Sequence, residues 1–296
     1  MIYKSQFNRL KNACKIRVQL KGGFPMKGLI KTLFLNFSPR ALLRLLKKWH
    51  YVRELENFNE NDEKDLIVVK KLVEKGEVAV DIGANVGIYT KILSEKVMTT
   101  GHVYSIEPVP QTFSLLLHCV KKLGMANVKL FNIGISDSNR TVSMVVPPYA
   151  SGGENFYMAH IVAGSHKDVN ENTFEVKVKT LDSLFSELDE KITFIKCDVE
   201  GHEWPVICGA RKTIERTKPA WLIEISDSPD TSSTDARKVF SYFQENGYLP
   251  FWFDGNILRK RTIGTISVNY FFLTQEHIRR VESAGIKILG HSNGGH

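Results

Sequence analysis

The sequence predicts an α/β fold with a mostly parallel sheet, and three observations support this prediction. Short apolar strands alternate with helix-like segments of about 10–15 residues, which is typical of βαβ units. The first two strands end in acidic residues, which suit loops at one edge of a sheet. The chain has 296 residues, 43% hydrophobic and 24% charged, and this is enough to bury one sizeable core.

The regular elements follow one another in a clear order. A helix-like segment, 62–75, precedes the first strand, Val78–Ile82. Further strands are expected at 102–107, 128–133, 192–197, 220–225, 248–253 and 268–273, and further helices at 86–97, 110–123, 203–216 and 234–245. Right-handed crossovers between parallel strands place the loops that follow these strands at the same edge of the sheet.

The alternation is interrupted between the two halves of the domain. Thr141–Val146 and Phe174–Lys179 are predicted to pair as antiparallel strands, within an insertion at 138–180. Between them, Pro147–Thr173 is rich in Gly, Ser, Asn, Pro and His. A loop of this length in a compact domain is usually functional or disordered. One interpretation is a lid whose side chains contact a substrate, and its candidate residues are Tyr149, Phe156, Tyr157, His160 and His166. The other interpretation is a surface loop.

The N-terminal arm, residues 1–60, differs in charge from the domain that follows, 61–296. Residues 1–50 contain 12 Lys and Arg and no Asp or Glu, whereas residues 51–296 contain 28 basic and 32 acidic side chains. Ser38 and Pro39 suit a helix start, and Leu42, Leu45, Leu46 and Trp49 then form one apolar face opposite basic residues. Such a helix packs on its own domain or contacts an anionic membrane or a partner.

Several classes of protein are disfavoured by these features. No run of about 18 apolar residues is present, so no transmembrane helix is expected. No signal peptide is recognisable, and the four cysteines have no zinc or CxxC spacing, so we expect reduced thiols in a cytoplasmic protein. A nucleic-acid enzyme usually carries positive charge around its site, whereas here the basicity belongs to the arm. We expect no nucleic-acid partner.

The segment from Val80 to Gly87 carries the clearest chemical signal. A strand ends at Asp81, and the turn Gly83-Ala84-Asn85-Val86-Gly87 then opens a helix. Gly83 permits a sharp turn, and Gly87 permits close packing of strand and helix. The spacing does not match the dinucleotide fingerprint GxGxxG, and there is no Walker lysine. A ligand with an adenosine and no phosphate fits better, and S-adenosylmethionine is such a ligand.

Two further strand ends are expected beside this turn. Glu107 ends the second strand and is placed to accept hydrogen bonds from both ribose hydroxyls. Ser136 and Asp137 follow the third strand and are candidates for binding the adenine amino group. For each of these strand ends, an ordinary turn or helix cap is the alternative interpretation.

These motifs together resemble the FkbM family of S-adenosylmethionine-dependent methyltransferases. The resemblance rests on Asp81–Gly87, Ile106-Glu107-Pro108, Lys196-Cys-Asp198-Val-Glu200-Gly201-His-Glu203, Cys208-Gly209-Ala210 and Leu222–Ile225. It implies a class I, Rossmann-like fold: a seven-stranded sheet with an antiparallel last strand, helices on both faces and O-methyl transfer, often to sugar hydroxyls. The implied cofactor-binding residues are Asp81, Gly83, Ala84, Asn85, Gly87, Glu107, Pro108, Ser136, Asp137 and Asp198.

The acceptor is expected after the fourth and fifth parallel strands. Asp198, Glu200 and His202 follow the fourth strand in one short turn, and Glu224 ends the fifth. A general base contributes roughly 10²–10⁴-fold to the reaction of an alcohol, and our order of candidates is Glu200, His202, Asp198. Each has a structural alternative: orienting the cofactor amine, capping the next helix, or lying on its surface. A divalent metal at this turn is compatible with the residues, but we predict none.

Three other functions were weighed against an O-methyltransferase acting on a carbohydrate or related molecule. A nicotinamide oxidoreductase is disfavoured because the GxGxxG spacing is missing. The segment Val146-Pro147-Pro148-Tyr149 resembles a motif of base-amine methyltransferases, but its first residue is apolar and it precedes the fourth strand. A non-catalytic subunit that retains the fold is the main alternative, although it would have no need for an intact cofactor turn.

Overall fold

The computed structural model describes residues 40–146, 160–161, 172–186 and 190–290. The chain divides into two units, residues 1–47 and 48–296. The arm of residues 1–60 and its boundary stay a prediction. Ser38 and Pro39 lie outside the described residues, as do the proposed lid residues Tyr149, Phe156, Tyr157 and His166.

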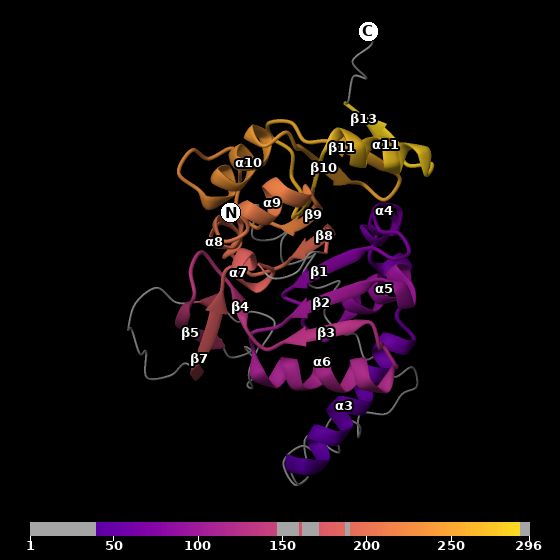
Figure 1. Ribbon diagram of the computed structural model, residues 1–296, viewed down its shortest axis with the longest axis vertical. Coiled ribbons are helices and arrows are strands. Elements are labelled where there is room, and N and C mark those ends of the chain that lie inside the picture. Colours follow the sequence, from indigo (N-terminus) through magenta and orange to yellow (C-terminus); the bar gives the residue numbers. More distant parts are fainter. Residues whose placement is uncertain (1–39, 147–159, 162–171, 187–189, 291–296) are drawn as a thin grey trace, which may run out of the picture. The chain divides into compact units, whose positions relative to one another are not determined.

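The central sheet confirms the predicted α/β class and contains more strands than expected. Among the described residues its order is β13-β11-β10-β12-β9-β8-β1-β2-β3, as Figure 1 shows for the neighbours β8, β1, β2 and β3. The strands are β1 Val78–Ile82, β2 His102–Ile106, β3 Val128–Phe131, β8 Ile192–Cys197, β9 Ala220–Glu224, β10 Leu249–Phe253, β11 Ile257–Lys260, β12 Asn269–Leu273 and β13 Lys287–Leu289. The count is therefore nine and not seven, because β11 and β13 extend the β10 edge.

The strand directions place the candidate loops at one edge. β3, β2, β1, β8 and β9 are parallel neighbours, so their carboxyl ends meet at the same edge. β12 runs antiparallel between β9 and β10, as the resemblance implied. Because of that direction, its first residue, Asn269, lies opposite Glu224 at the end of β9. The start of β12 therefore joins the carboxyl edge of the parallel strands.

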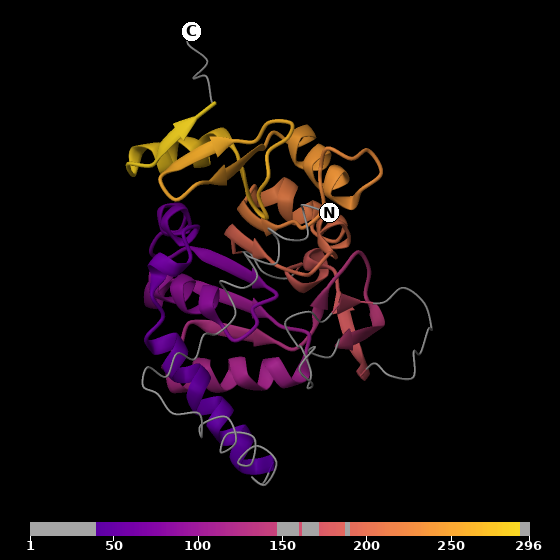
Figure 2. The ribbon, with the colours of Figure 1, turned by 180° about the vertical axis from the view of Figure 1, so that it is seen from behind.

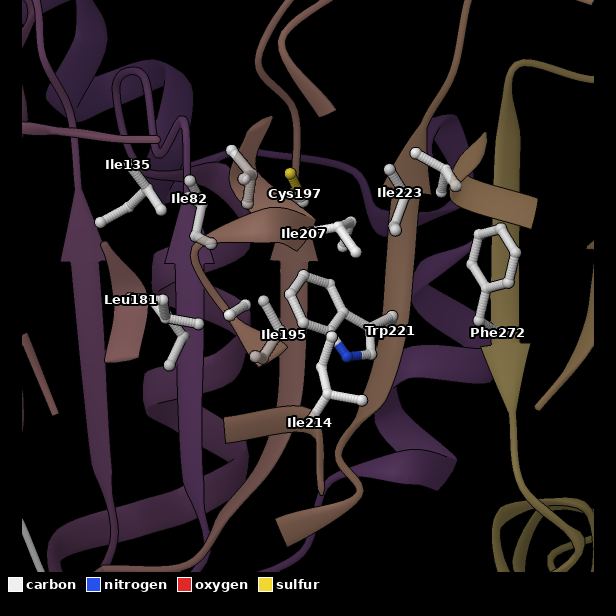
Figure 3. Close-up of a cluster of buried hydrophobic side chains, with 14 of the residues drawn as sticks. Ile82, Ile135, Leu181, Ile195, Cys197, Ile207, Ile214, Trp221, Ile223 and Phe272 are labelled. Atoms are coloured by element: carbon white, nitrogen blue, oxygen red, sulfur yellow. The ribbon is translucent and has the colours of Figure 1, made fainter. Parts of the chain in front are cut away.

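Helices cover both faces of the sheet. α4 (Leu66–Leu72), α5 (Ile88–Val97) and α11 (Gln275–Ser283) pack against one face, which buries Ala79, Phe194 and Leu222 among others. α8 (Glu203–Cys208), α9 (Arg211–Thr217) and α10 (Asp235–Glu245) pack against the other. Figure 3 shows side chains of this second cluster, including Ile82, Cys197, Ile207 and Trp221. α6 (Pro110–Lys122) packs its Leu116 and Val120 beside Ala84.

The sequence-based helix at 203–216 is wrong as a single element. It is two helices, α8 and α9, and Gly209 ends the first of them. A Cβ atom on Gly209 would lie 2.0 Å from the Ser136 carbonyl oxygen, so the break lets the chain approach the segment after β4 (Gly134–Ile135). The helix expected at 62–75 is shorter, because the 3₁₀ turn Glu60–Asp62 precedes α4. α11 was not expected.

A second, smaller sheet confirms the predicted antiparallel pair. β5 (Arg140–Val146) pairs with β7 (Asn172–Lys179), and β4 and β6 (His160–Ile161) flank them among the described residues. Figure 2 shows β5 and β7 from behind, beside the ends of the central strands and away from β11 and β13. His160 pairs with Val145 at the end of this sheet. The short helix α7 (Leu181–Leu184) leads back to the central sheet.

The helix α3 (Arg40–Glu56) has two apolar faces with different surroundings. Tyr51 and Leu55 are buried in a cluster with residues of α6 such as Leu115 and Cys119. Leu45 and Trp49, from the stripe noted in the sequence, are 63% and 59% exposed. The guanidinium of Arg53 lies 5.1 Å from the centre of the Trp49 ring. The face that packs in the described structure is therefore not the face that carries Leu45 and Trp49.

Candidate active site

The turn after β1 is built around a glycine that no other residue can replace without movement. Gly83 has a φ of +78°, and a Cβ atom there would lie 1.8 Å from the Asp198 carbonyl oxygen. The amide of Asp198 in turn donates to the Ile82 carbonyl at 3.0 Å. The β1 turn and the loop after β8 are therefore in backbone contact. Gly87, with a φ of +104°, faces the Leu116 side chain of α6 rather than β1.

Glu107 is held rigidly beside this turn. Its Oε2 accepts from the Asn85 amide and its Oε1 from the Val109 amide, both at 2.9 Å. Asn85 adopts a left-handed conformation, φ 51°, which Asn tolerates better than most residues and which directs its amide at Glu107. The side chain of Glu107 is 5% exposed. Burial raises the pKa of Glu107 to about 7, although the two amides counteract this.

Asp81 lies in a buried polar row on the α5 side of the sheet. Thr90 donates to the Asp81 carboxylate at 2.6 Å and also contacts Ser105 on β2 at 2.9 Å. Burial raises the pKa of Asp81 to about 6, and the hydrogen bond from Thr90 opposes that rise. On the other side of Asp81, Lys196 of β8 is its partner in the register. The acid predicted at the end of β1 is thus bound by the Thr90 hydroxyl, and the buried ammonium of Lys196 opposes the rise of its pKa.

Ser136 lies within hydrogen-bond distance of both Asp137 and His202, one of the predicted base candidates. The Ser136 hydroxyl lies 3.0 Å from His202 Nε2 and donates to Asp137 Oδ1, also at 3.0 Å. Arg140 binds the same Asp137 carboxylate and lowers the pKa of that carboxyl. Because the carboxylate only accepts hydrogen bonds, Ser136 donates to it and accepts from His202. Burial lowers the pKa of His202, which favours the neutral ring. The structure therefore brings His202 to the candidate adenine residues.

Asp198 and Glu200 remain at the centre of the carboxyl edge. The Lys196 ammonium, 4% exposed, lies 3.7 Å from Asp198 Oδ2. Glu200 has a φ of 49° and is followed by Gly201 with a φ of +94°. A left-handed glutamate costs conformational energy and is a known feature of functional loops. Glu203, in the first turn of α8, stabilises this loop: its Oε1 accepts a hydrogen bond from the Gly201 amide at 2.8 Å.

Sequence reasoning missed several polar residues of this edge. Lys196 belongs to one of the motifs, but no role is predicted for it from the sequence. Its position in an apolar strand, two residues before Asp198, places both side chains on the same face of the sheet. Glu203 accepts a hydrogen bond from the Gly201 amide in the loop after β8, and burial raises the pKa of its carboxyl to about 7. Asn132 donates to the carbonyls of Glu107 and Pro108. Asp65 and Asn269, which lie near Glu224, carried no sequence signal, because their proximity depends on the antiparallel β12.

Comparison with known proteins decides the family. The profile of the Methyltransferase FkbM domain matches residues 81–250, more than half of the chain. The chain belongs to the FkbM methyltransferase family. Its cofactor is S-adenosylmethionine, so the prediction of both family and cofactor is confirmed. No curated protein matches the chain significantly.

Several solved structures are similar to part of this chain at low sequence identity. An FkbM methyltransferase from Methylobacillus flagellatus KT is 19% identical with a TM-score of 0.45, and the match covers 68% of this chain but only 44% of that one. Fibrillarin from Aeropyrum pernix, solved with natively bound S-adenosyl-L-methionine, is 12% identical, with a TM-score of 0.41 and 68% coverage of both chains. A SAM-dependent O-methyltransferase from Thermotoga maritima is 14% identical, TM-score 0.40, covering 76% of this chain and 71% of that one.

The residues of the FkbM site fit the cofactor. Asn85 and Glu107 form a rigid turn beside β1, and the carboxylate of Glu107 retains lone pairs for ribose hydroxyls after accepting its two amides. Gly83 lets the turn pack directly against the Asp198 carbonyl, where any side chain would collide. When bound, the cofactor supplies an electrophilic methyl group on a positively charged sulfur. Within the described residues, no three His, Cys, Asp or Glu side chains are grouped to hold a metal ion.

Proposed function

We propose that this FkbM methyltransferase transfers the methyl group to a hydroxyl oxygen, and that the acceptor is a sugar of a polysaccharide, glycolipid or natural product. The observation that carries the proposal is the backbone contact between Gly83 and Asp198. It brings a loop with two carboxylates, Asp198 and Glu200, directly against the turn that binds the methyl donor. A hydroxyl acceptor needs a base at that position, whereas a thiolate or a tertiary amine does not.

Glu200 is the proposed base. Its left-handed backbone is held by Gly201 and Glu203, which fixes the loop before any acceptor binds. Asp198 is paired with the buried Lys196, so it is better suited to hold a positively charged part of the cofactor. His202 contacts Ser136, one of the candidate adenine residues, and we assign it to the cofactor side and not to the base role. Glu200 accepts the proton of the acceptor hydroxyl, and the rigid loop aligns that hydroxyl.

The test is methyl transfer from labelled S-adenosylmethionine to a panel of glycans and glycosides, with the modified position identified by NMR. Glu200→Gln keeps the size of the side chain and removes its basicity, so kcat is expected to fall about 10²-fold or more. The dissociation constant for S-adenosylhomocysteine should stay within about twofold, since Glu200 is assigned to the acceptor. Glu215→Gln, on the exposed side of α9, is the matched control.

Two results would overturn this proposal. Full activity of Glu200→Gln on a glycan would remove Glu200 from the base role. Binding of S-adenosylmethionine without transfer to any hydroxyl acceptor, combined with transfer to an amine or carbon acceptor, would contradict O-methylation. Absence of both binding and transfer would favour a non-catalytic subunit that retains the fold.

The proposed place of this activity is the cytoplasmic face of a membrane, where lipid-linked glycans are accessible. Among the helices that the structure describes, none has the length and apolar character needed to span a membrane. The support is the exposed Trp49 with Arg53 above its ring, on an arm with 12 basic and no acidic residues before residue 51. Aromatic and basic side chains together suit an anionic lipid surface.

Co-sedimentation with vesicles tests this localisation. The full chain should bind vesicles that contain anionic lipid, lose binding in high salt, and bind about tenfold more weakly as Trp49→Ser. Ile263→Ser removes an exposed apolar side chain outside α3 and is the control. Equal binding of the three proteins to neutral and anionic vesicles would show that α3 does not recognise anionic lipid.

A further inference from the structure

Asp65 is a buried carboxylate with an unusual partner. It stands at the start of α4, but its side chain does not cap the helix. Instead its Oδ2 accepts from Asn269 Nδ2 at 2.8 Å. Asp65 is 1% exposed, and its Oδ1 has no hydrogen-bond partner in the described structure. The Oδ1 of Asn269 is also buried without a partner. Two neighbouring side chains thus present acceptor oxygens that nothing in the described chain satisfies.

The surroundings of this pair are strongly acidic. Lys196 is buried, and carboxylates around it raise its pKa against the lowering effect of burial, with Asp198 and Glu224 the largest contributors. Lys196 also acts on Glu63 and Asp65. Burial raises the pKa values of both Glu63 and Asp65, and their mutual repulsion adds to the rise for Glu63. Two ammonium groups, those of Lys64 and Lys196, therefore face four carboxylates, those of Glu63, Asp65, Asp198 and Glu224. This excess of acids favours a ligand that brings hydrogen-bond donors or positive charge.

The position of the pair separates it from the adenosine side of the cofactor site. Asn269 begins β12, which is three strands from β1 and four from β2 in the sheet order. At about 4.8 Å per strand spacing, this is about 14 Å from the line of β1 and about 19 Å from that of Glu107. The loop with Asp198 and Glu200 lies between the two places. The pair therefore lies on the side of the base that faces away from the adenosine.

We infer that Asp65 and Asn269 form an acceptor subsite that binds hydroxyl or ammonium groups of a polyhydroxylated, uncharged or amine-bearing substrate and disfavours anionic sugars. This inference rests on the proposed O-methyl transfer and specifies its substrate class. Buried acceptor oxygens gain most from ligand O–H and N–H groups, because unmatched acceptors are costly. A carboxylate or phosphate of the substrate would be repelled by Glu63, Asp65 and Glu224.

The experiment compares three methyl glycosides of one ring shape: a glucoside, a glucosaminide and a glucuronide. Their binding to the full chain loaded with S-adenosylhomocysteine is followed by ligand-observed NMR, and their methylation by product formation. The glucoside or the glucosaminide should bind more tightly than the glucuronide. Asp65→Asn retains the shape of the side chain and should weaken the favoured sugar about tenfold or more, in Kd and in kcat/KM. Asp62→Asn, an exposed acid in the same segment, should change neither.

The dissociation constant for S-adenosylhomocysteine shows whether Asp65 and Asn269 bind the acceptor sugar or the ammonium group of the cofactor. It should be unchanged in Asp65→Asn, and an equal weakening of that ligand would assign the pair to the cofactor ammonium and overturn the inference. Preference for the glucuronide, no effect of Asp65→Asn, or no sugar binding at all would also overturn it. Sugar binding that depends on Asp65 but leads to no methylation would support the subsite and contradict the proposed O-methyl transfer, so the two failures are distinguishable.

Discussion

The two ends of the carboxyl edge satisfy their carboxylates in different ways. Glu107, on the cofactor side, accepts a backbone amide with each of its oxygens, and Asn85 is held in a left-handed conformation to provide one of them. Asp65, on the other side, shares one oxygen with Asn269 and leaves the other without a partner. The backbone thus completes the hydrogen bonds of Glu107, whereas those of Asp65 are completed only in part by a side chain distant in the sequence.

The largest effect should come from breaking the backbone contact between the β1 turn and the loop after β8. Gly83→Ala places a methyl group against the Asp198 carbonyl, so the β1 turn and the β8 loop must separate. We expect binding of S-adenosylhomocysteine to be lost by calorimetry, and a drop of about 3 kcal/mol or more in the free energy of unfolding. Gly247→Ala has a similar positive φ, +85°, but open space around the new methyl group.

Gly247→Ala therefore reports backbone strain alone, which is about 1–2 kcal/mol. If the two variants lose the same stability and Gly83→Ala still binds S-adenosylhomocysteine, the contact with Asp198 is not what holds the site together. Denaturant unfolding and calorimetry on both proteins give the comparison directly.

The second effect concerns the charge of Glu107. The burial-raised pKa of about 7 means that this carboxyl takes up a proton as the pH falls below 7. Ribose hydroxyls donate best to the ionised form, so affinity for S-adenosylhomocysteine should fall below pH 7, by up to about tenfold per pH unit. Glu107→Gln should bind about 10–100-fold more weakly at pH 8 and lose this pH dependence. A parent profile that is flat from pH 5 to 8 would show that Glu107 does not contact the ligand.

The smallest effect is expected for His202→Gln, which tests whether His202 acts on cofactor binding or on the acceptor reaction. Because His202 contacts Ser136 and the neutral ring is favoured, His202→Gln should weaken S-adenosylhomocysteine only about threefold and leave kcat nearly unchanged. Calorimetry and steady-state kinetics on the same preparation measure both quantities. A loss of kcat near 10²-fold with intact cofactor binding would return His202 to the role of base.

Local patterns predicted the half of the site that is built from consecutive residues. The turn Gly83–Gly87 follows a strand directly, so its residue types and spacing identify it without knowledge of the rest of the chain. Glu107 and Asp198 were predicted for the same reason, as the ends of recognisable strands. The break at Gly209 was missed because a helical pattern on both sides hides a glycine whose reason is the distant Ser136 carbonyl.

The sequence by itself determined the α/β class, because the alternation of strands and helices is a local signal, and the resemblance of its motifs indicated the family and the cofactor. Only the tertiary structure decided which polar residues that are distant in the sequence contact one another. His202 meets Ser136 because α8 packs over the segment after β4, and Asp65 meets Asn269 because β12 runs antiparallel beside β9. Residues 204 positions apart in the chain become neighbours through strand order, which no local pattern of residues encodes.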